Sequence, residues 1–266
     1  MKKEEKLLMA IGGADERLIE EALEVRVRRK PVILRWVAVA ACVCLLLASP
    51  VGASVVGMLK EAVGLTGHSV FYTDTRFSQE DFSQEARAAV VKQARDREFY
   101  SMEDLDAAEE FLGMELPNNA VLSKAAPEII TLDVYSEDQL IETYSAPCLV
   151  ELERNSGHAL TSAFVWAEYM MEAGTITAKY VATTEEFPDE SNYTVGFDNK
   201  ESARENYVTE AGLEAVVYSR KVDYGYGSWE ARGVLVVDNY LVGLCVYEWS
   251  EGEAITTLKT ILDAYG

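Results

Sequence analysis

The stretch from Trp36 to Val56 limits the fold of this chain more than any other feature, because it contains no charged residue over about 21 positions. A helix rises about 1.5 Å per residue, so a helix of this length crosses the roughly 30 Å hydrocarbon core of a bilayer. No comparable apolar run occurs elsewhere in the 266 residues. The sequence therefore predicts a single transmembrane helix, with its bounds at residues 32–56.

Basic side chains gather on one side of this stretch and set its expected orientation. After the stretch, the first two basic residues are Lys60 and Arg76. Short flanks rich in Lys and Arg stay in the cytoplasm. We therefore expect a cell-membrane protein with a cytoplasmic N-terminus and an extracytoplasmic C-terminal domain. The topogenic residues before the stretch are Arg26, Arg28, Arg29, Lys30 and Arg35.

Three other interpretations of the apolar stretch stay open. Small residues around Ala48 and Ala53 offer cleavage sites for a signal peptide, although the basic region lies far into the chain for one. Val39-Ala40-Ala41-Cys42 has the form of a lipobox, but the apolar stretch continues well beyond Cys42. A buried helix of a soluble protein leaves the one-sided clustering of basic residues unexplained.

Charge is distributed unevenly along the chain, whose net charge is −21. Residues 1–35 carry nine basic and seven acidic side chains, whereas residues 57–266 carry 15 basic and 38 acidic ones. A domain this acidic repels nucleic acid and anionic lipid head groups, so no nucleic-acid partner is expected. Its closest approach to a calcium loop, Asp189-Glu190-Ser191-Asn192, lacks the required spacing, and no metal site is expected.

The chain before the large domain divides into a tail, the apolar stretch and a connector. Residues 1–31 form the expected cytoplasmic tail, in which Asp15 is placed to cap a short amphipathic helix. The apolar face of that helix either lies on the bilayer or docks a cytoplasmic partner. Residues 57–77 contain several glycines and are interpreted as a connector. The candidate docking residues of the tail are Leu18, Ile19, Ala22 and Leu23.

Residues 78–266 form the expected extracytoplasmic domain, which begins with two helices. A helical pattern runs from Ser78 to about Phe99. A capping-box-like sequence, Ser101 to Asp104, predicts a second helix that ends at Gly113. From Pro127 the apolar period changes towards two, which indicates strands. The predicted strands are 129–135, 148–154, 159–171, 175–183, 193–197, 213–221, 229–237 and 240–249.

The C-terminal part closes this pattern. Asp238-Asn239 predicts a tight hairpin turn, and Ser250 to Glu253 is another capping box. The helix that follows carries Ile255, Leu258, Ile261 and Leu262 on one face, suited to packing on a sheet. Helices, a mostly antiparallel meander and a closing helix predict an α+β fold. Cys148 and Cys245 either form a disulfide or stay as buried thiols.

The tail carries an acidic motif around Asp15-Glu16, and a basic stretch and Trp36 precede an Ala/Cys-rich span that ends near Pro50. This pattern resembles a group of single-pass, anti-sigma-factor-like proteins of Gram-positive bacteria. The exported part is similar to an uncharacterised domain whose first helix ends in L-G-x-x-L-P, here Leu112 to Pro117. The chain departs from the tail motif in having Gly12-Gly13-Ala14 ahead of Asp15, and it lacks the H-x₃-C-x₂-C zinc signature. The resemblance implies a cytoplasmic sigma factor as partner. Its tail residues are Ile11, Asp15-Glu16, Leu18-Ile19, Glu21-Ala22, Arg28-Arg29-Lys30, Arg35-Trp36, Ala40-Ala41-Cys42 and Pro50.

Catalytic motifs are absent from the sequence. No nucleophile elbow, zinc-protease, P-loop or dinucleotide-binding pattern occurs, and His68 and His158 have no metal-ligand spacing. Tyr224, Tyr226 and Trp229 form a candidate aromatic loop, which either stacks a ligand or is a hairpin loop with one ring tucked in. We therefore expect no enzyme and no cofactor.

These observations favour a membrane-anchored sensor or regulator. Its outer domain binds an unknown ligand or envelope partner, and its tail contacts a cytoplasmic regulatory protein such as a sigma factor. The alternative is an envelope binding or structural protein without a cytoplasmic partner. An exported enzyme of unrecognised type is the third reading, and it requires a pocket with converging polar groups.

Overall fold

The structure is a computed structural model that describes residues 59–63, 68–73, 75–136, 139–171, 174–184, 197–198, 202–224, 227–248 and 250–266. All of them belong to one compact unit, Val55–Gly266. In chain order the elements are β1 (Leu59–Val63), β2 (His68–Thr73), α4 (Gln84–Lys92), β3 (Arg97–Met102), α5 (Leu105–Leu112), β4 (Ala126–Glu128), β5 (Ile130–Ser136), β6 (Gln139–Ala146), β7 (Cys148–Arg154), β8 (Leu160–Met171), β9 (Gly174–Thr183), β10 (Phe197–Asp198), β11 (Ala203–Val208), β12 (Glu214–Tyr224), β13 (Gly227–Val237), β14 (Tyr240–Glu248) and α6 (Glu251–Asp263).

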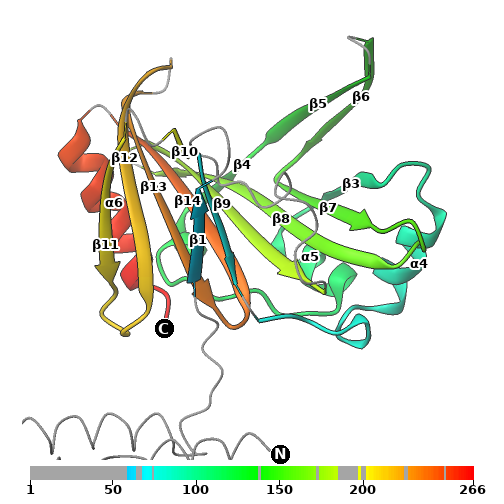
Figure 1. The fold of residues 1–266 in the computed structure, drawn as a ribbon. Coiled ribbons are helices and arrows are strands. Elements are labelled where there is room, and N and C mark those ends of the chain that lie inside the picture. Colours follow the sequence, from blue (N-terminus) through cyan, green and yellow to red (C-terminus); the bar gives the residue numbers. More distant parts are fainter. Residues whose placement is uncertain are drawn as a thin grey trace, which may run out of the picture. The chain divides into compact units, whose positions relative to one another are not determined.

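A nine-stranded antiparallel sheet is the centre of this unit. Its strands follow the order β11-β12-β13-β14-β9-β8-β7-β3, and β4 pairs with the end of β8. The sheet is strongly curved (Figure 1). Most neighbours in it are also neighbours along the chain, as hairpin connections between antiparallel strands require. The exceptions are the β9–β14, β3–β7 and β4–β8 pairs, which join distant parts of the sequence.

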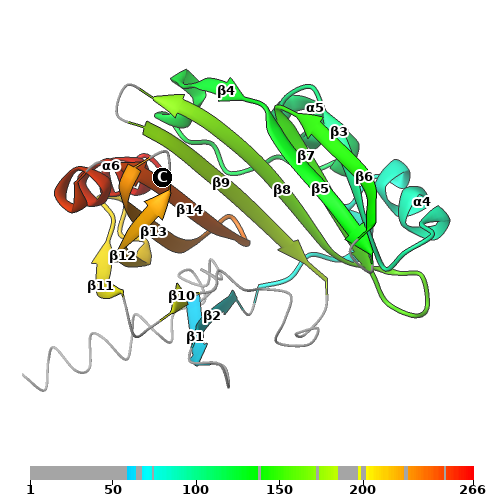
Figure 2. The ribbon, with the colours of Figure 1, turned by 90° about the horizontal axis from the view of Figure 1, so that it is seen from above.

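The described helices α4, α5 and α6 pack on one face of this sheet and enclose the larger core. Alternate residues of the strands point to this face, among them Val150, Val165 and Val242. Helix α6 contributes Leu258, and α4 and α5 contribute further buried apolar side chains, so one cluster spans the sheet. Figure 2 shows α6 beneath one end of the sheet and α4 and α5 beside the other.

A second, smaller sheet lies over part of the opposite face. It has the order β1-β2-β10, and β2 brings Phe71 down onto the large sheet. Phe71 is fully buried and meets Tyr218 edge to face at 5.9 Å. Around it lie Phe164, Val181, Val216, Val234, Val236 and Leu241. The face opposite the helices is therefore only partly covered by this sheet.

Strands β5 and β6 form a hairpin arm that pairs with no other strand among the described residues. The arm projects from the large sheet (Figure 1). At its base, Phe99 and Tyr144 contact each other with ring centroids 5.5 Å apart. Tyr135 and Leu140 are exposed near its tip, which is unusual for large apolar side chains.

The predicted α+β class is wrong: the described residues hold fourteen strands against three short α-helices, so the domain is mostly β. The helix expected from Ser78 to Phe99 contributes to this error. Ser83 rather than Ser78 caps α4, and the helix ends at Lys92. Residues 97–102 instead form an edge strand on β7, because pairing with a distant strand outweighs the local helical pattern. The second helix is capped by Asp104, not Ser101, which lies in β3.

The connector expected at residues 57–77 contains β1 and β2, which pair with each other. The predicted transmembrane character is not supported by the part of the chain that the structure describes. None of the helices there is both long and apolar enough to cross a bilayer. The predicted span at 32–56 and the tail residues Leu18, Ile19, Ala22 and Leu23 lie outside the described residues, as do the topogenic Arg26, Arg28, Arg29, Lys30 and Arg35.

Local signals at the C-terminal end are confirmed. Asp238 and Asn239 both have positive φ, 47° and 71°, as a two-residue hairpin turn requires. Ser250 accepts a hydrogen bond from the Glu253 amide and begins α6. Gly113 ends α5 in the left-handed conformation with φ 75°.

Of the two expected states for Cys148 and Cys245, the structure shows free thiols. Two strands separate β7 from β14, which at about 4.8 Å per strand places these sulfurs too far apart to bond.

Candidate ligand site on the open face of the sheet

Polar side chains line the face of the sheet that the helices do not cover. Lys179 on β9 lies directly between Trp166 on β8 and Gly243 on β14. One row further along, Thr177 pairs with Cys245, and Cys245 pairs with Arg232. Because every second residue of a strand points to the same face, these two rows lie side by side.

The rows enclose a pocket of about 250 Å³. Gly243 has no side chain, so the centre of strand β14 leaves space between its neighbours. The volume suits a small ligand or one functional group of a larger one, since pockets for drug-sized ligands start at about 300 Å³. The lining residues are Trp166, Thr177, Lys179, Arg232, Gly243, Leu244, Cys245 and Tyr247.

Lys179 is the most unusual group in this pocket. Its Nζ lies 4.1 Å from the ring centroid of Trp166 and 4.5 Å from that of Phe164. Both distances fall within the range of cation–π contacts. Among the described residues, no carboxylate comes within ion-pair distance of this ammonium. Burial lowers the pKa of Lys179 to about 8, against the opposing effect of Glu151 and Glu153.

Glu151 and Glu153 belong to a neighbouring cluster, in which they form ion pairs with Arg97. Arg97 on β3 reaches Glu153 at 2.6 Å and Glu151 at 3.7 Å. Both glutamates are buried, and desolvation raises the pKa of each carboxyl, with Lys179 and Arg97 acting in the other direction. Arg97 is therefore the ion-pair partner of both carboxylates, and their effect on Lys179 is a longer-range Coulomb interaction.

A second buried cluster lies on the other side of the pocket, around Glu230. This carboxylate is fully buried on β13 and accepts hydrogen bonds from Arg220, at 2.6 Å, and from Arg232. The Cys245 thiol also donates to it at 3.3 Å. Glu230 thus holds the Arg232 side chain in place, and the pocket has positive charge on two of its sides.

The chemistry of the pocket favours binding over covalent catalysis. Burial raises the pKa of Cys245 to about 12, so the thiol stays protonated near neutral pH and is a poor nucleophile. The cations, Thr177 and Tyr247 all supply hydrogen-bond donors, whereas no carboxylate of the described residues lines the pocket. A donor-rich pocket beside an indole ring fits an anionic group attached to a flat or apolar body.

Trp229 of the candidate aromatic loop is not part of this pocket. Trp229 packs half-buried against the helix-side core, on the opposite face of the sheet. Tyr226 and the side chain of Tyr224 lie outside the described part of the structure. Trp229 is therefore the ring of this loop whose packing the structure describes, and the choice between the two interpretations stays a prediction.

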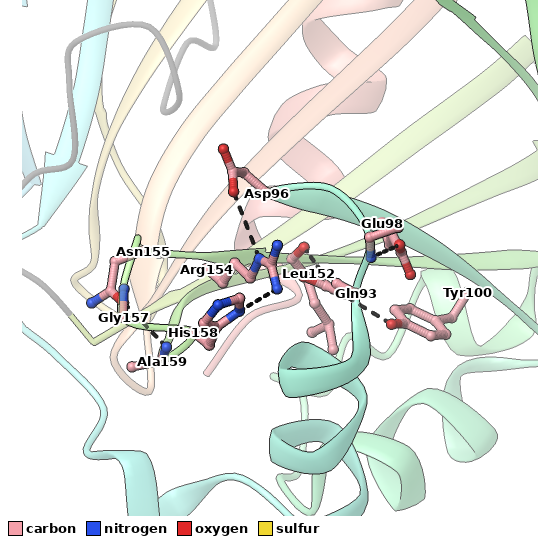
Figure 3. Close-up of polar contacts among 11 residues, drawn as sticks. Gln93, Asp96, Glu98, Tyr100, Leu152, Arg154, Asn155, Gly157, His158 and Ala159 are labelled. Atoms are coloured by element: carbon pink, nitrogen blue, oxygen red, sulfur yellow. Dashed lines mark hydrogen bonds and ion pairs between the residues drawn. The ribbon is translucent and has the colours of Figure 1, made fainter.

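His158 lies in the turn between β7 and β8, far along the sheet from the pocket rows. Arg154 contacts its Nδ1, and the Asn155 carboxamide accepts from the Gly157 and Ala159 amides at 2.9 and 3.1 Å (Figure 3). Figure 3 also shows Asp96 reaching Arg154. This network fixes a turn. His68 lies in β2, and no group of His, Cys, Asp and Glu suited to a metal exists among the described residues.

Sequence reasoning missed every residue of this pocket. A signal existed in the charged residues placed inside predicted strands, namely Lys179, Glu230 and Arg232. A charged side chain in the middle of a buried strand needs a partner or a ligand. Comparisons with family models, curated proteins and solved structures find no match to this chain.

Proposed function

We propose that this domain is the ligand-binding part of a sensor or regulator, and that it takes a small anion with an aromatic or apolar body. The observation that supports this proposal most directly is the environment of the Lys179 ammonium. This ammonium lies in a pocket over two aromatic rings, and among the described residues no carboxylate is within ion-pair distance. A half-buried cation without a close counter-ion gains free energy when an anion binds beside it.

The neighbouring groups define the ligand further. Arg232 adds a second positive charge on the pocket wall, and Trp166 offers an apolar surface. A carboxylate attached to an aromatic ring matches this combination of donors and indole at the size of the pocket. In this proposal, ligand binding is the input of the sensor. The tail contact with a cytoplasmic protein, the sigma-factor partner and the cell-membrane localisation stay predictions.

Benzoate is the probe that tests the proposal, with benzamide as its uncharged counterpart. Ligand-observed NMR titration should show benzoate binding to the full chain and benzamide binding at least about tenfold more weakly, because charged hydrogen bonds are worth roughly 1.5–3 kcal/mol. Lys179→Met should lower benzoate affinity by the same factor. The control is Lys92→Met, an exposed lysine at the end of α4. Equal binding of benzoate and benzamide, or full affinity in Lys179→Met, overturns the proposal.

The affinity for benzoate should also depend on pH in one direction. Below pH 8 the Lys179 ammonium is charged, and above it the free protein loses this proton. Binding then requires proton uptake, so affinity is level up to about pH 7.5 and falls above pH 8, approaching tenfold per pH unit. Lys179→Arg keeps its charge over this range and should show no such fall. A titration that is equally level for both proteins up to pH 9.5 contradicts the assignment to Lys179.

A further inference from the structure

A larger cleft lies on the other face of the sheet, away from the pocket around Lys179. It has a volume of about 450 Å³ and lies between α5, the segment 116–127 and the strands β8 and β9. Figure 2 shows α5 and β4 at this end of the sheet. Apolar side chains form part of its walls, with Leu105, Leu116 and Pro117 among them.

The charged lining of this cleft has one sign. Asp104, Asp106 and Glu109 on and beside α5 line it, and within the described part of the chain no Lys or Arg does. Asp104 uses one oxygen to accept from the Ala107 amide at 2.8 Å, and Glu109 uses one to accept from Leu116 at 2.8 Å. Each carboxylate has a second oxygen left for a ligand, because a carboxylate accepts through both oxygens.

Tyr169 provides an independent sign of a ligand. It is 6% exposed, it lines the cleft, and its hydroxyl is buried without a hydrogen-bond partner in the described part of the protein. The hydroxyl of the neighbouring Tyr180, by contrast, forms a hydrogen bond of 3.3 Å with the hydroxyl of Tyr265. A buried hydroxyl without a partner costs free energy, which a ligand that bonds to it would recover.

The three carboxylates do not converge as metal ligands do. Among the described residues, no group of three or more His, Cys, Asp and Glu side chains is arranged to hold a metal ion. Negative charge spread over an apolar, tyrosine-walled cleft suits an extended cation better than a divalent ion. The ammonium of such a cation meets the carboxylates, and its carbon body packs on the Leu and Pro side chains.

We infer that this cleft is a second binding site, specific for an organic amine with an apolar body, and separate from the anion pocket. Asp106 and Glu109 bind the ammonium group, and the Tyr169 hydroxyl accepts a hydrogen bond from it. The two faces of one sheet therefore recognise ligands of opposite charge. This inference stands whether or not the anion pocket binds benzoate, because no residue is shared by the two linings.

Phenethylamine is the probe, and 2-phenylethanol is its uncharged counterpart of nearly the same shape. Ligand-observed NMR titration of the full chain should show the amine binding at least about tenfold more tightly than the alcohol. The Asp106→Asn/Glu109→Gln double variant should lose about tenfold or more in amine affinity, and Tyr169→Phe about threefold. These changes preserve shape, and circular dichroism confirms that each variant is folded before it is titrated.

The matched control is Glu110→Gln, which removes an exposed carboxylate from the same helix without touching the cleft. It should leave amine affinity within about twofold of the natural protein, as an exposed charge outside the site contributes little. Benzoate should not compete with phenethylamine. The inference is overturned if the alcohol binds as well as the amine, if the double variant keeps full affinity, or if Glu110→Gln loses as much as the double variant.

Discussion

Replacing Glu230 by alanine is expected to lower the free energy of unfolding by about 3–5 kcal/mol. Glu230 is fully buried on an interior strand of the large sheet, and it pairs with Arg220 and Arg232. Removing the carboxylate leaves Arg220 and Arg232, whose side chains are 27% and 23% exposed, without the counter-ion that they share. The penalty is mainly that of uncompensated buried charge, so it exceeds the net value of the ion pair itself. Urea unfolding followed by circular dichroism measures it.

The control for this substitution is a surface ion pair on the same domain. Lys259 reaches Glu205 at 2.8 Å, and both side chains are partly open to solvent. Glu205→Gln should therefore cost less than about 1 kcal/mol, because water screens exposed charges and replaces the lost contact. Glu230→Gln keeps the volume and one acceptor, and should fall between the two. If Glu230→Ala costs no more than Glu205→Gln, the cluster around Glu230 is not a buried charge network.

The same substitution links stability to the anion pocket. Arg232 lines the pocket and is held by Glu230, so the glutamate is a positioning residue for one of its two cations. Glu230→Gln should therefore reduce benzoate affinity less than Lys179→Met does, since it loosens the position of Arg232 but also removes a negative charge beside the pocket. Comparing the loss of benzoate affinity in the two variants distinguishes the direct contact of Lys179 with the ligand from the positioning of Arg232 by Glu230.

How far the fold follows from the sequence depends on how local each signal is. The hairpins from β7 to β9 and from β12 to β14 were predictable, because their alternation of apolar residues and their turns lie within short windows. The same holds for α6, where Ser250 and the spacing of Leu258, Ile261 and Leu262 lie within four turns.

Other elements depend on partners far away in the chain. Strand β3 forms because it pairs at the sheet edge with β7, which lies some fifty residues later in the chain. No pattern within residues 97–102 predicts this pairing. Strand β6 was not predicted because both of its faces are largely exposed, so burial imposes no apolar alternation on it. Such strands add to those that local periodicity predicted, and together they make the described domain mostly β.

The candidate sites illustrate the same limit more sharply. Lys179 lies opposite Trp166 within a hairpin, and this pair follows once the register of β8 and β9 is known. Its other neighbour, Gly243, comes from β14, which pairs with β9 across more than sixty residues. A one-residue shift in that register would move every side chain of β14 to the other face of the sheet, and the pocket would not form. Sequence patterns give the strands but not the register between distant ones.

Replacing Leu258 by alanine is the second change with a large expected effect, a loss of about 2–5 kcal/mol in the free energy of unfolding. Leu258 is fully buried where α6 crosses the sheet. It packs over Gly233, and a Cβ built there would lie 3.1 Å from Leu258 Cδ1. The glycine thus brings helix and sheet into close contact, and truncating the leucine opens a cavity that the sheet backbone is not free to fill. Urea unfolding measures the loss.

The matched control is Thr256→Ala, two residues away on the exposed side of α6, which should change stability by no more than about 0.5 kcal/mol. Gly233→Ala tests the same contact from the sheet side, since its new methyl group presses on Leu258 and Leu262. Because the extra volume and the cavity offset each other, Gly233→Ala should cost less beside Leu258→Ala than it does alone. Strictly additive losses in the double variant would show that α6 does not pack on Gly233 as described, and that its hold on the sheet lies elsewhere along the helix.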